Sequence, residues 1–174
     1  MRQAETLVEL YKVRGMTCAT AESCTGGGVG SAITAVPGAS AVFYGGVISY
    51  DNSVKQNVLG VRSDTLRTVG AVSAECAAEM ANGVRKLVGA DIAVSVTGIA
   101  GPGGGSDLKP VGLVWFGLAS AQGVRTEKAI FPGDRAKVRE QAVLHAIGML
   151  TAAVVLEVHF IYGVALIRSS QAPY

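Results

Sequence analysis

Charged side chains are scarce in this sequence. Asp, Glu, Lys and Arg together make up 16% of the 174 residues, and the formal net charge is only +2. A charge this small does not by itself indicate a nucleic-acid partner, although a phosphate-bearing small molecule needs only one or two local cations. Hydrophobic residues reach 49%. This composition argues against disorder and suits a sheet that helices bury on both faces.

Cysteine is also scarce, and no CxxC pair is present. The count is three, an odd number that makes a poor disulfide framework, at Cys18, Cys24 and Cys76. We therefore expect reduced thiols, as in a cytosolic protein. The first 14 residues lack the apolar centre of a signal peptide, because two glutamates interrupt them. The sequence thus predicts a cytoplasmic protein.

No uncharged apolar run is long enough to cross a membrane, which takes about 20 residues. The best candidate, residues 142–167, is interrupted by two histidines and a glutamate. We interpret this stretch as a buried helix followed by an apolar tail. The chain length fits one domain with its own core. We therefore assign residues 1–156 to a single domain and residues 157–174 to an apolar tail of the same domain.

The spacing of apolar residues and the turn residues between them predict alternating strands and helices. Ser73 and Asp134 are the expected N-caps of the two longest helices. Ser63 and Asp64 are expected to open only a short turn. Expected strands cover residues 17–21, 43–50, 92–97, 111–120 and 124–131, and expected helices cover residues 7–14, 28–35, 52–59, 73–88 and 134–155. This order predicts an α/β fold, a three-layer α/β/α sandwich with a mixed, mostly parallel sheet of about five strands.

Two loops follow strands at the edge where open α/β sheets bind ligands, because loops and helix N-termini present unpaired N–H groups there. In the first, residues 22–28, Ser23 leaves a strand and enters a helix whose glycines let a ligand touch backbone. The alternative is that Ser23 or Thr25 merely caps this helix. The second loop, residues 98–112, holds six glycines and two prolines but matches neither the P-loop nor GxGxxG. A binding loop and a mobile connector both remain open for it.

A nucleophile at Ser23 would need a base other than histidine. The only histidines, His145 and His159, lie on or after the last helix, so a Ser-His-Asp triad is disfavoured. Lys55, with Tyr50 nearby, is the available base. A neutral lysine requires burial that lowers its pKa from about 10.4 to about 7 or 8. The alternative is a solvated lysine on a short helix.

Arg135 and Arg139 lie one turn apart on the last expected helix. Side chains with this spacing share one helix face, so the two guanidinium groups would clamp a phosphate. Two arginines near a helix start are more often solvated. The sequence alone leaves both interpretations open.

Several motifs occur in a fixed order along the chain. They are TAESCTGG at 20–27, GVISY at 46–50 with Lys55, GAVS at 70–73, TGIAGP at 97–102, KPVG at 109–112, and GDR at 133–135 with Arg139. Together they closely resemble the CinA C-terminal domain family over residues 5–150. The resemblance implies a nicotinamide-nucleotide amidohydrolase, which converts nicotinamide mononucleotide to nicotinic acid mononucleotide and ammonia.

The resemblance also implies roles for individual residues. The family's catalytic serine, tyrosine and lysine fall on Ser23, Tyr50 and Lys55. On this hypothesis Ser23 attacks the carboxamide, Lys55 accepts and returns the proton, and Tyr50 orients or relays it. The expected contacts to the oxyanion, ribose and phosphate come from Thr25, Gly26, Gly27, Thr97, Gly98, Gly101, Gly104 and Arg139. The reaction needs no metal and no organic cofactor, and the expected partner is a pyridine nucleotide.

Other interpretations remain. A short-chain oxidoreductase also uses Ser, Tyr and Lys, but its YxxxK spacing differs from that of Tyr50 and Lys55, and the dinucleotide fingerprint is missing. A non-enzymatic nucleotide-binding or interaction module is the stronger alternative. Many relatives carry an additional N-terminal domain with a separate nucleotide-cleaving activity, which we expect to be absent here. The apolar residues 160–167 predict packing on a sister subunit, and hence a homo-oligomer. The interrupted apolar run and the small net charge predict no membrane partner and no nucleic-acid partner.

Overall fold

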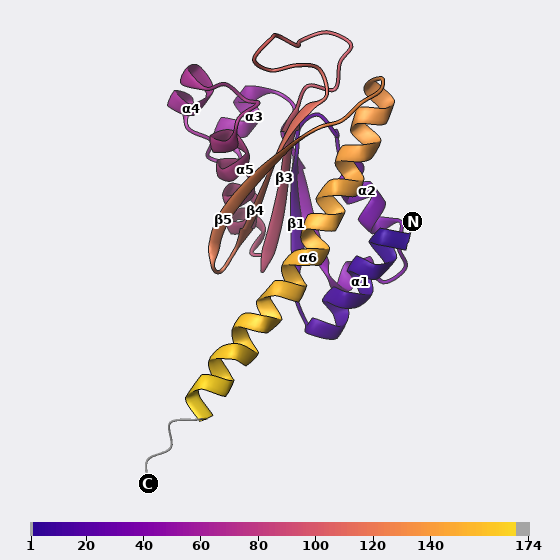
Figure 1. The fold of residues 1–174 in the computed structure, drawn as a ribbon, viewed down its shortest axis with the longest axis vertical. Coiled ribbons are helices and arrows are strands. Elements are labelled where there is room, and N and C mark those ends of the chain that lie inside the picture. Colours follow the sequence, from indigo (N-terminus) through magenta and orange to yellow (C-terminus); the bar gives the residue numbers. More distant parts are fainter. Residues whose placement is uncertain (1, 170–174) are drawn as a thin grey trace.

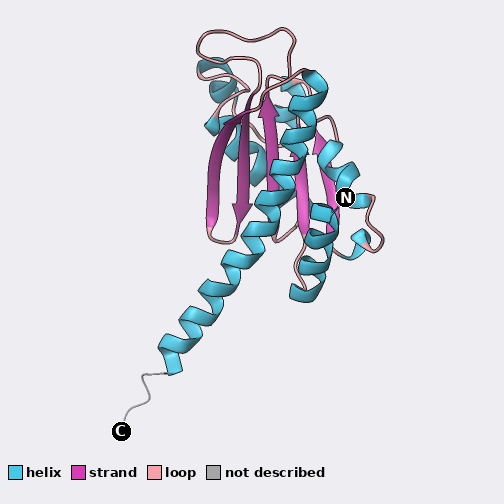
Figure 2. Ribbon diagram, turned by 45° about the vertical axis from the view of Figure 1, so that its right-hand side comes forward, coloured by secondary structure: helices cyan, strands magenta, loops and turns pink. Residues whose placement is uncertain are grey.

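The computed structural model describes the backbone of residues 2–169 and the side chains of residues 2–155. Helices cover both faces of a central sheet, as Figures 1 and 2 show. In chain order the elements are α1 (Arg2–Arg14), β1 (Cys18–Glu22), α2 (Gly28–Thr34), η1 (Ala39–Ala41), β2 (Phe43–Ile48), α3 (Asn52–Asn57), α4 (Ser63–Thr68), α5 (Ala74–Val88), β3 (Ile92–Gly98), β4 (Leu113–Ser120), β5 (Gly123–Ile130) and α6 (Arg135–Ser169). The predicted three-layer α/β/α sandwich is confirmed.

The sheet has five strands in the order β2-β1-β3-β4-β5. Strand β1 is parallel to both β2 and β3, whereas β4 is antiparallel to both β3 and β5. Four strands therefore point one way and β4 opposes them, which confirms the predicted mixed sheet. The carboxyl ends of β1, β2 and β3 consequently meet at one edge of the sheet.

One core lies between the sheet and the layer formed by α1, α2 and α6 (Figure 1). Its members are the apolar side chains that the sequence places at helical or strand spacing, such as Leu7, Ile33 and Ile147. Tyr11 is fully buried, and its hydroxyl donates to the Leu150 carbonyl at 3.0 Å. The first helix is thereby fastened to the last across the face of the sheet.

A second, smaller core lies on the other face, where α5 covers the sheet. Cys76, Met80 and Val84 recur at helical spacing and are fully buried. Ser73 caps this helix, since its hydroxyl accepts from the Cys76 N–H at 3.2 Å. The predicted helix and its cap are confirmed. All three cysteines of the chain are free and buried.

Two predicted elements differ from the structure. Residues 63–68 form the short helix α4 instead of a turn. Helix α6 was expected to end near Val155, but its backbone continues to Ser169 and leaves the body of the domain (Figure 1). An apolar run can continue a helix as readily as it forms a tail, so composition did not mark an end. The expected packing of residues 157–174 on a sister subunit lies outside the described side chains.

Helix α6 also bears on the membrane prediction. Among the described residues, the stretch Arg135–Val155 has the length and apolar composition to cross a membrane, and 44% of its apolar window is buried within the fold. The buried part includes Val138, Ala142 and Leu150, which belong to the first core. A core helix passes the same test of length and composition. This stretch therefore adds no independent argument for a membrane location.

Candidate active site

A cavity of about 300 Å³ opens at the edge where β1, β2 and β3 end. Residues from five separated parts of the chain line it. They are Ser23, Cys24, Tyr50, Asn52, Lys55, Ala71, Val72, Thr97, Gly98, Ile99, Ala100, Gly101, Gly103, Gly104 and Arg135. The fold thus places both glycine-containing loops and the Tyr50–Lys55 segment around one space. This volume is at the lower end of the range for small-molecule sites.

Ser23 is held at the end of β1 by its main chain. Its N–H donates to the Val96 carbonyl of β3 at 2.9 Å, and its carbonyl accepts from the Gly26 N–H at 3.0 Å. The turn into α2 requires positive φ at Gly26 (61°) and Gly27 (93°), a conformation that favours glycine. Ser23 therefore sits on a sharp strand-to-helix turn with its side chain in the cavity.

Glu22 fixes the helix side of this turn and was not predicted as a site residue. Its side chain is almost fully buried, and its two carboxylate oxygens accept from the N–H groups of Val29 at 3.0 Å and Gly30 at 2.8 Å. These N–H groups lie in the first turn of α2, where a negative charge is favoured. An acidic residue just before a glycine-rich helix start is the sequence signal that would have identified it.

Lys55 reaches Ser23 from the short helix α3, whose N-cap is Asp51. Only 1% of Lys55 is exposed. Its Nζ lies 3.1 Å from the Ser23 Oγ, 2.6 Å from the Ser49 carbonyl oxygen and 3.1 Å from the Tyr50 carbonyl oxygen. The structure therefore brings the predicted nucleophile and the predicted base into hydrogen-bonding contact.

The burial of Lys55 makes its charged form less favourable than in water. Burial lowers the pKa of Lys55, and the opposing influences are smaller: the Cys76 and Cys24 thiols where they are ionised, and the Asp51 carboxylate. Burial also raises the pKa of the Cys76 and Cys24 thiols to about 11, so both are uncharged at neutral pH. In a neutral amine, two N–H groups would donate to the two carbonyls and leave the lone pair directed at the Ser23 hydroxyl. That arrangement is what a proton acceptor needs.

Tyr50 lies at the mouth of the cavity, with 58% of the residue exposed. Its hydroxyl accepts from the Arg135 guanidinium at 2.9 Å, and Arg135 also donates to the Gly101 carbonyl at 3.0 Å. Among the described residues, the Tyr50 hydroxyl is not hydrogen-bonded to Lys55 or Ser23. Tyr50 therefore contacts Lys55 through its main-chain carbonyl, and Arg135 joins its phenol to the glycine-rich loop.

Arg139, one turn beyond Arg135, has a different partner. Its guanidinium donates to the Thr25 carbonyl at 3.0 Å. Arg139, Thr25, Gly26 and Gly27 are not among the residues that line the cavity. Thr25 itself is buried, and its Oγ1 has no hydrogen-bond partner among the described residues. Of the two arginines, Arg135 is the one that reaches the cavity.

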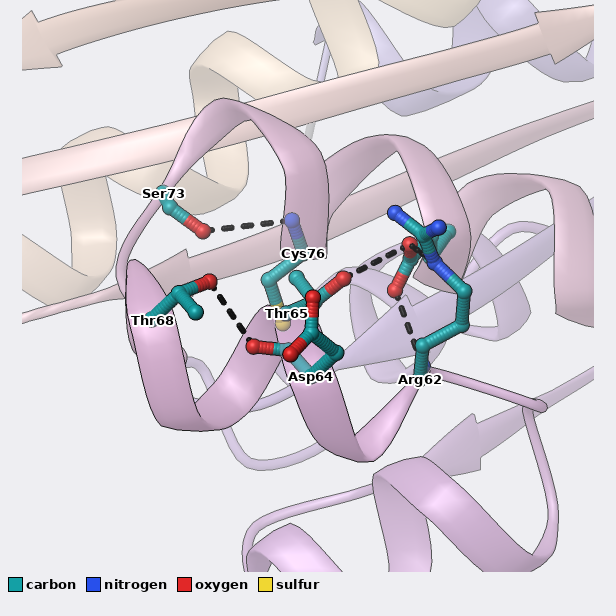
Figure 3. A network of polar contacts seen from close by, with 7 residues as sticks. Arg62, Asp64, Thr65, Thr68, Ser73 and Cys76 are labelled. Carbon is teal, nitrogen blue, oxygen red and sulfur yellow. Dashed lines mark hydrogen bonds and ion pairs between the residues drawn. The ribbon is translucent and has the colours of Figure 1, made fainter.

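The wall opposite Ser23 is formed by Ala71 and Val72, which were also not predicted. Thr97 holds this wall, because its buried hydroxyl donates to the Ala71 carbonyl at 2.8 Å. A separate polar network joins α4 to α5 (Figure 3). There Glu79 accepts from the Arg62 Nε at 2.7 Å and from the Thr65 hydroxyl at 2.8 Å. The GAVS motif at 70–73 contains both residues, but small apolar side chains in a turn carry no chemical signal, so the motif was not assigned to the cavity.

The glycine-rich loop, residues 98–112, is fastened at both ends. The Ile99 N–H donates to the Leu113 carbonyl at 2.9 Å, and the Gly112 N–H donates to the Ile99 carbonyl at 2.8 Å. A Cβ on Gly98 would lie 2.7 Å from the Leu113 carbonyl oxygen, so glycine is required for this close approach. Lys109 ties the loop to the α4–α5 turn through the Val69 carbonyl at 2.6 Å. The loop therefore forms a wall of the cavity and is no free connector.

Comparisons with known proteins agree with this architecture. A family model described as the CinA C-terminal domain matches residues 1–154. A CinA-like protein of Thermotoga maritima is 49% identical over 146 residues, which cover 84% of this chain and 36% of that protein. A CinA-like protein of Cyanothece sp. is 54% identical over 134 residues, covering 77% of this chain and 32% of that protein. The chain thus spans about a third of the length of these curated relatives.

Solved structures match the whole fold. A CinA superfamily protein from Klebsiella pneumoniae superposes with a TM-score of 0.85 at 38% identity, covering 88% of this chain and 96% of that one. A competence/damage-inducible protein from Agrobacterium tumefaciens gives a TM-score of 0.85 at 41% identity, covering 87% of this chain and 93% of that one. Both likenesses concern the fold as a whole.

Proposed function

The chain belongs to the CinA C-terminal domain family, and on that premise we propose that it hydrolyses the carboxamide of nicotinamide mononucleotide to give nicotinic acid mononucleotide and ammonia. The observation that carries this proposal is the contact between the buried Lys55 Nζ and the Ser23 Oγ at 3.1 Å. A serine in contact with a buried amine whose pKa is lowered is a nucleophile beside its candidate base. Its place in a cavity at the carboxyl ends of the strands gives a substrate access to both groups.

In the first half of the reaction, the Ser23 oxygen attacks the carboxamide carbon while its proton passes to Lys55. The tetrahedral intermediate then expels the amide nitrogen, which takes the proton from Lys55 and leaves as ammonia. An ester between Ser23 and the nicotinate carbonyl remains. In the second half, a water molecule attacks this ester, Lys55 again accepts and returns a proton, and Ser23 is released with the free carboxylate.

The oxyanion of each tetrahedral intermediate needs fixed donors near Ser23. The main-chain N–H groups of Thr25 and Gly27 have no hydrogen-bond partner among the described residues, whereas the Gly26 N–H is already used within the turn. The first two are therefore the candidate donors, for an oxyanion that lies beside this turn and outside the residues that line the cavity. Glu22 holds the start of α2, and so it keeps these N–H groups in place for the reaction.

The nucleotide's phosphate and ribose would lie against the outer part of the cavity. Arg135 carries a positive charge there and is oriented by Gly101 and Tyr50. A phosphate oxygen would replace one of these partners in a charge-assisted hydrogen bond. Gly103 and Gly104 let backbone approach the sugar closely. Arg139 acts in this scheme by holding the Thr25 carbonyl, and Tyr50 by positioning both Lys55 and Arg135.

Ammonia release from nicotinamide mononucleotide tests the proposal. We expect Ser23→Ala and Lys55→Met each to lower kcat by at least about a thousandfold, because each removes one member of a pair that acts as a unit. Matched controls are Ser31→Ala and Lys12→Met, which alter exposed residues of α2 and α1 and should leave kcat within about twofold.

Nucleotide binding, measured by calorimetry on the same variants, separates this enzyme from a non-enzymatic binding module. The proposal expects Ser23→Ala to bind the nucleotide without hydrolysing it. If wild type and Ser23→Ala bind equally well and release ammonia equally slowly, the chain is a nucleotide-binding module and the amidohydrolase proposal is wrong.

A further inference from the structure

Strand β5 leaves an open edge on the sheet, remote from the cavity that contains Ser23. It is the last strand in the order β2-β1-β3-β4-β5, and its pairing with β4 is regular over all eight residues. It contains no proline and no bulge, two of the devices that block exposed edges, and its three charged side chains, Arg125, Glu127 and Lys128, limit which strands can pair with it. Val124 and Ile130 on this strand are 42% and 61% exposed. An edge of this kind is suited to pairing with another strand.

The direction of each main-chain group on this edge follows from the hairpin. Strand β4 ends at Ser120, β5 begins at Gly123, and these two residues pair across a two-residue turn. Odd-numbered residues of β5 therefore bond to β4, as the Phe131 N–H still does to the Gly112 carbonyl at 3.0 Å. Even-numbered residues from Val124 to Ile130 consequently direct their N–H and C=O groups outward.

The odd-numbered side chains of β5 carry the charges that a partner strand would meet. Glu127 lies on the α6 face, where its Oε1 contacts the His145 Nε2 at 2.5 Å. Arg125 lies on the same face, and its guanidinium has no hydrogen bond or ion pair among the described residues. Arg125 also borders two hollows of about 210 and 600 Å³ beside α6. This face thus offers one unpaired cation and one anion two residues apart.

We propose that β5 of one copy of this chain pairs antiparallel with β5 of a second copy, centred on Thr126, to form a homodimer with a continuous sheet. In this register Thr126 faces Thr126 and Val124 faces Lys128 as hydrogen-bonded pairs, because all three are outward-directed positions. Arg125 of each copy then faces Glu127 of the other as a non-hydrogen-bonded pair, in which side chains approach most closely.

Charge also disfavours the neighbouring registers. In the new strand pair, outward-directed residues must lie opposite outward-directed residues, because only these can form the hydrogen bonds. The centre of a two-fold symmetric pair is therefore always a residue, and the neighbouring registers are centred on Arg125 and on Glu127. Centring on Arg125 would place Arg125 opposite Arg125, and centring on Glu127 would place Glu127 opposite Glu127. Like charges directly opposite each other destabilise a strand pair. The sequence of β5 therefore favours this register over its two neighbours, with a second copy of the same strand as its complement.

Sedimentation of the full chain over a range of concentrations tests the interface. We expect the wild type to form a dimer, and Arg125→Glu and Glu127→Arg each to raise the dimer Kd roughly tenfold or more, because each opposes like charges twice in the symmetric pair. The double variant Arg125→Glu/Glu127→Arg restores opposite charges and should recover most of the lost affinity. A monomeric wild type, a dimer unaffected by the single variants, or no recovery in the double variant would overturn the proposal.

Cysteine cross-linking tests the register independently of charge. In the proposed pair, Thr126→Cys brings two Cα atoms to about 5.5 Å, within reach of a disulfide. Val124→Cys on the same strand is the matched control, because its two copies would be about 13 Å apart. The native cysteines are buried and do not compete. Under mild oxidation we expect a covalent dimer from Thr126→Cys alone. Equal cross-linking of both variants, or of Val124→Cys only, would contradict this register.

Discussion

At the scale of single residues, the pKa of Lys55 is lowered because its amine is buried. Between this lowered value and the ordinary value of 10.5, the unfolded chain binds a proton at this site more often than the folded chain does. Folding stability from this residue therefore rises with pH across that window. Below the window both states carry the proton, and the dependence vanishes.

The rise of folding stability with pH gives a prediction for Lys55→Met. Relative to this variant, the wild type should gain free energy of unfolding as the pH is raised toward 10.5, because only the wild type has the buried amine. Urea denaturation at several pH values measures the difference. Lys12→Met, at a partly exposed lysine paired with Glu9, should show no such trend. A difference between wild type and Lys55→Met that does not change with pH would contradict a lowered pKa for Lys55.

The two arginines of α6 should respond differently to substitution. Arg135 lines the cavity, so Arg135→Met should raise KM for nicotinamide mononucleotide about tenfold or more while changing kcat less. Arg139 holds the Thr25 carbonyl, so Arg139→Met should lower kcat without the same rise in KM. Steady-state ammonia release measures both, with the exposed Arg67→Met as control. A larger KM effect at Arg139 would place the phosphate there.

Sequence reasoning at this scale identified residue types better than side-chain directions. It selected Ser23 and Lys55 as a pair, and the structure places them in contact. It named Arg139 as the contact to the substrate, whereas Arg135 lines the cavity, because one helical turn puts both on the same face and only the fold decides which one reaches the cavity. Glu22 was missed because a carboxylate that binds main-chain N–H groups matches no catalytic pattern.

At the scale of elements, α5 and α6 each contain an interior glycine, and the two glycines differ in the space around them. A Cβ on Gly83 of α5 would collide with the carbonyl of Leu59, whereas a Cβ on Gly148 of α6 would meet nothing within 4 Å. Helix α5 therefore approaches the α3–α4 segment through a site that only glycine fits. At Gly148 no described neighbour requires glycine.

These two glycines form a matched pair of substitutions. Gly148→Ala should raise the free energy of unfolding by about 0.5–1 kcal/mol, because alanine is the better helix former. Gly83→Ala should lower it by about 1–3 kcal/mol, because the collision outweighs the same gain. Chemical denaturation of both variants gives the two values. Similar changes of one sign would show that α5 does not approach Leu59 closely.

Most elements were predictable because their apolar spacing and caps agree with each other. Ser73 and the buried stripe of α5 are one such case. The helix α4 was missed because six residues provide too little periodicity to distinguish a helix from a turn. The end of α6 was misplaced because Val155 is followed by neither glycine nor proline.

At the scale of the whole molecule, the family model matches residues 1–154, and among the described side chains the larger core reaches Val154. Removal of residues 157–174 should therefore leave the thermal midpoint within a few degrees, roughly the effect of less than 1 kcal/mol. The dimer proposed through β5 should also persist, as sedimentation would show. A truncated chain that becomes monomeric would assign the subunit contact to the removed residues instead.

The account depends most on how Ser23 and Lys55 face the substrate. A crystal structure of Lys55→Met with nicotinamide mononucleotide bound tests this directly, because this variant retains Ser23 but lacks its base. We predict that the Ser23 oxygen lies about 3 to 3.5 Å from the carboxamide carbon, with the phosphate near Arg135. A nucleotide whose carboxamide points away from Ser23, or that binds elsewhere on the molecule, would contradict the proposed reaction.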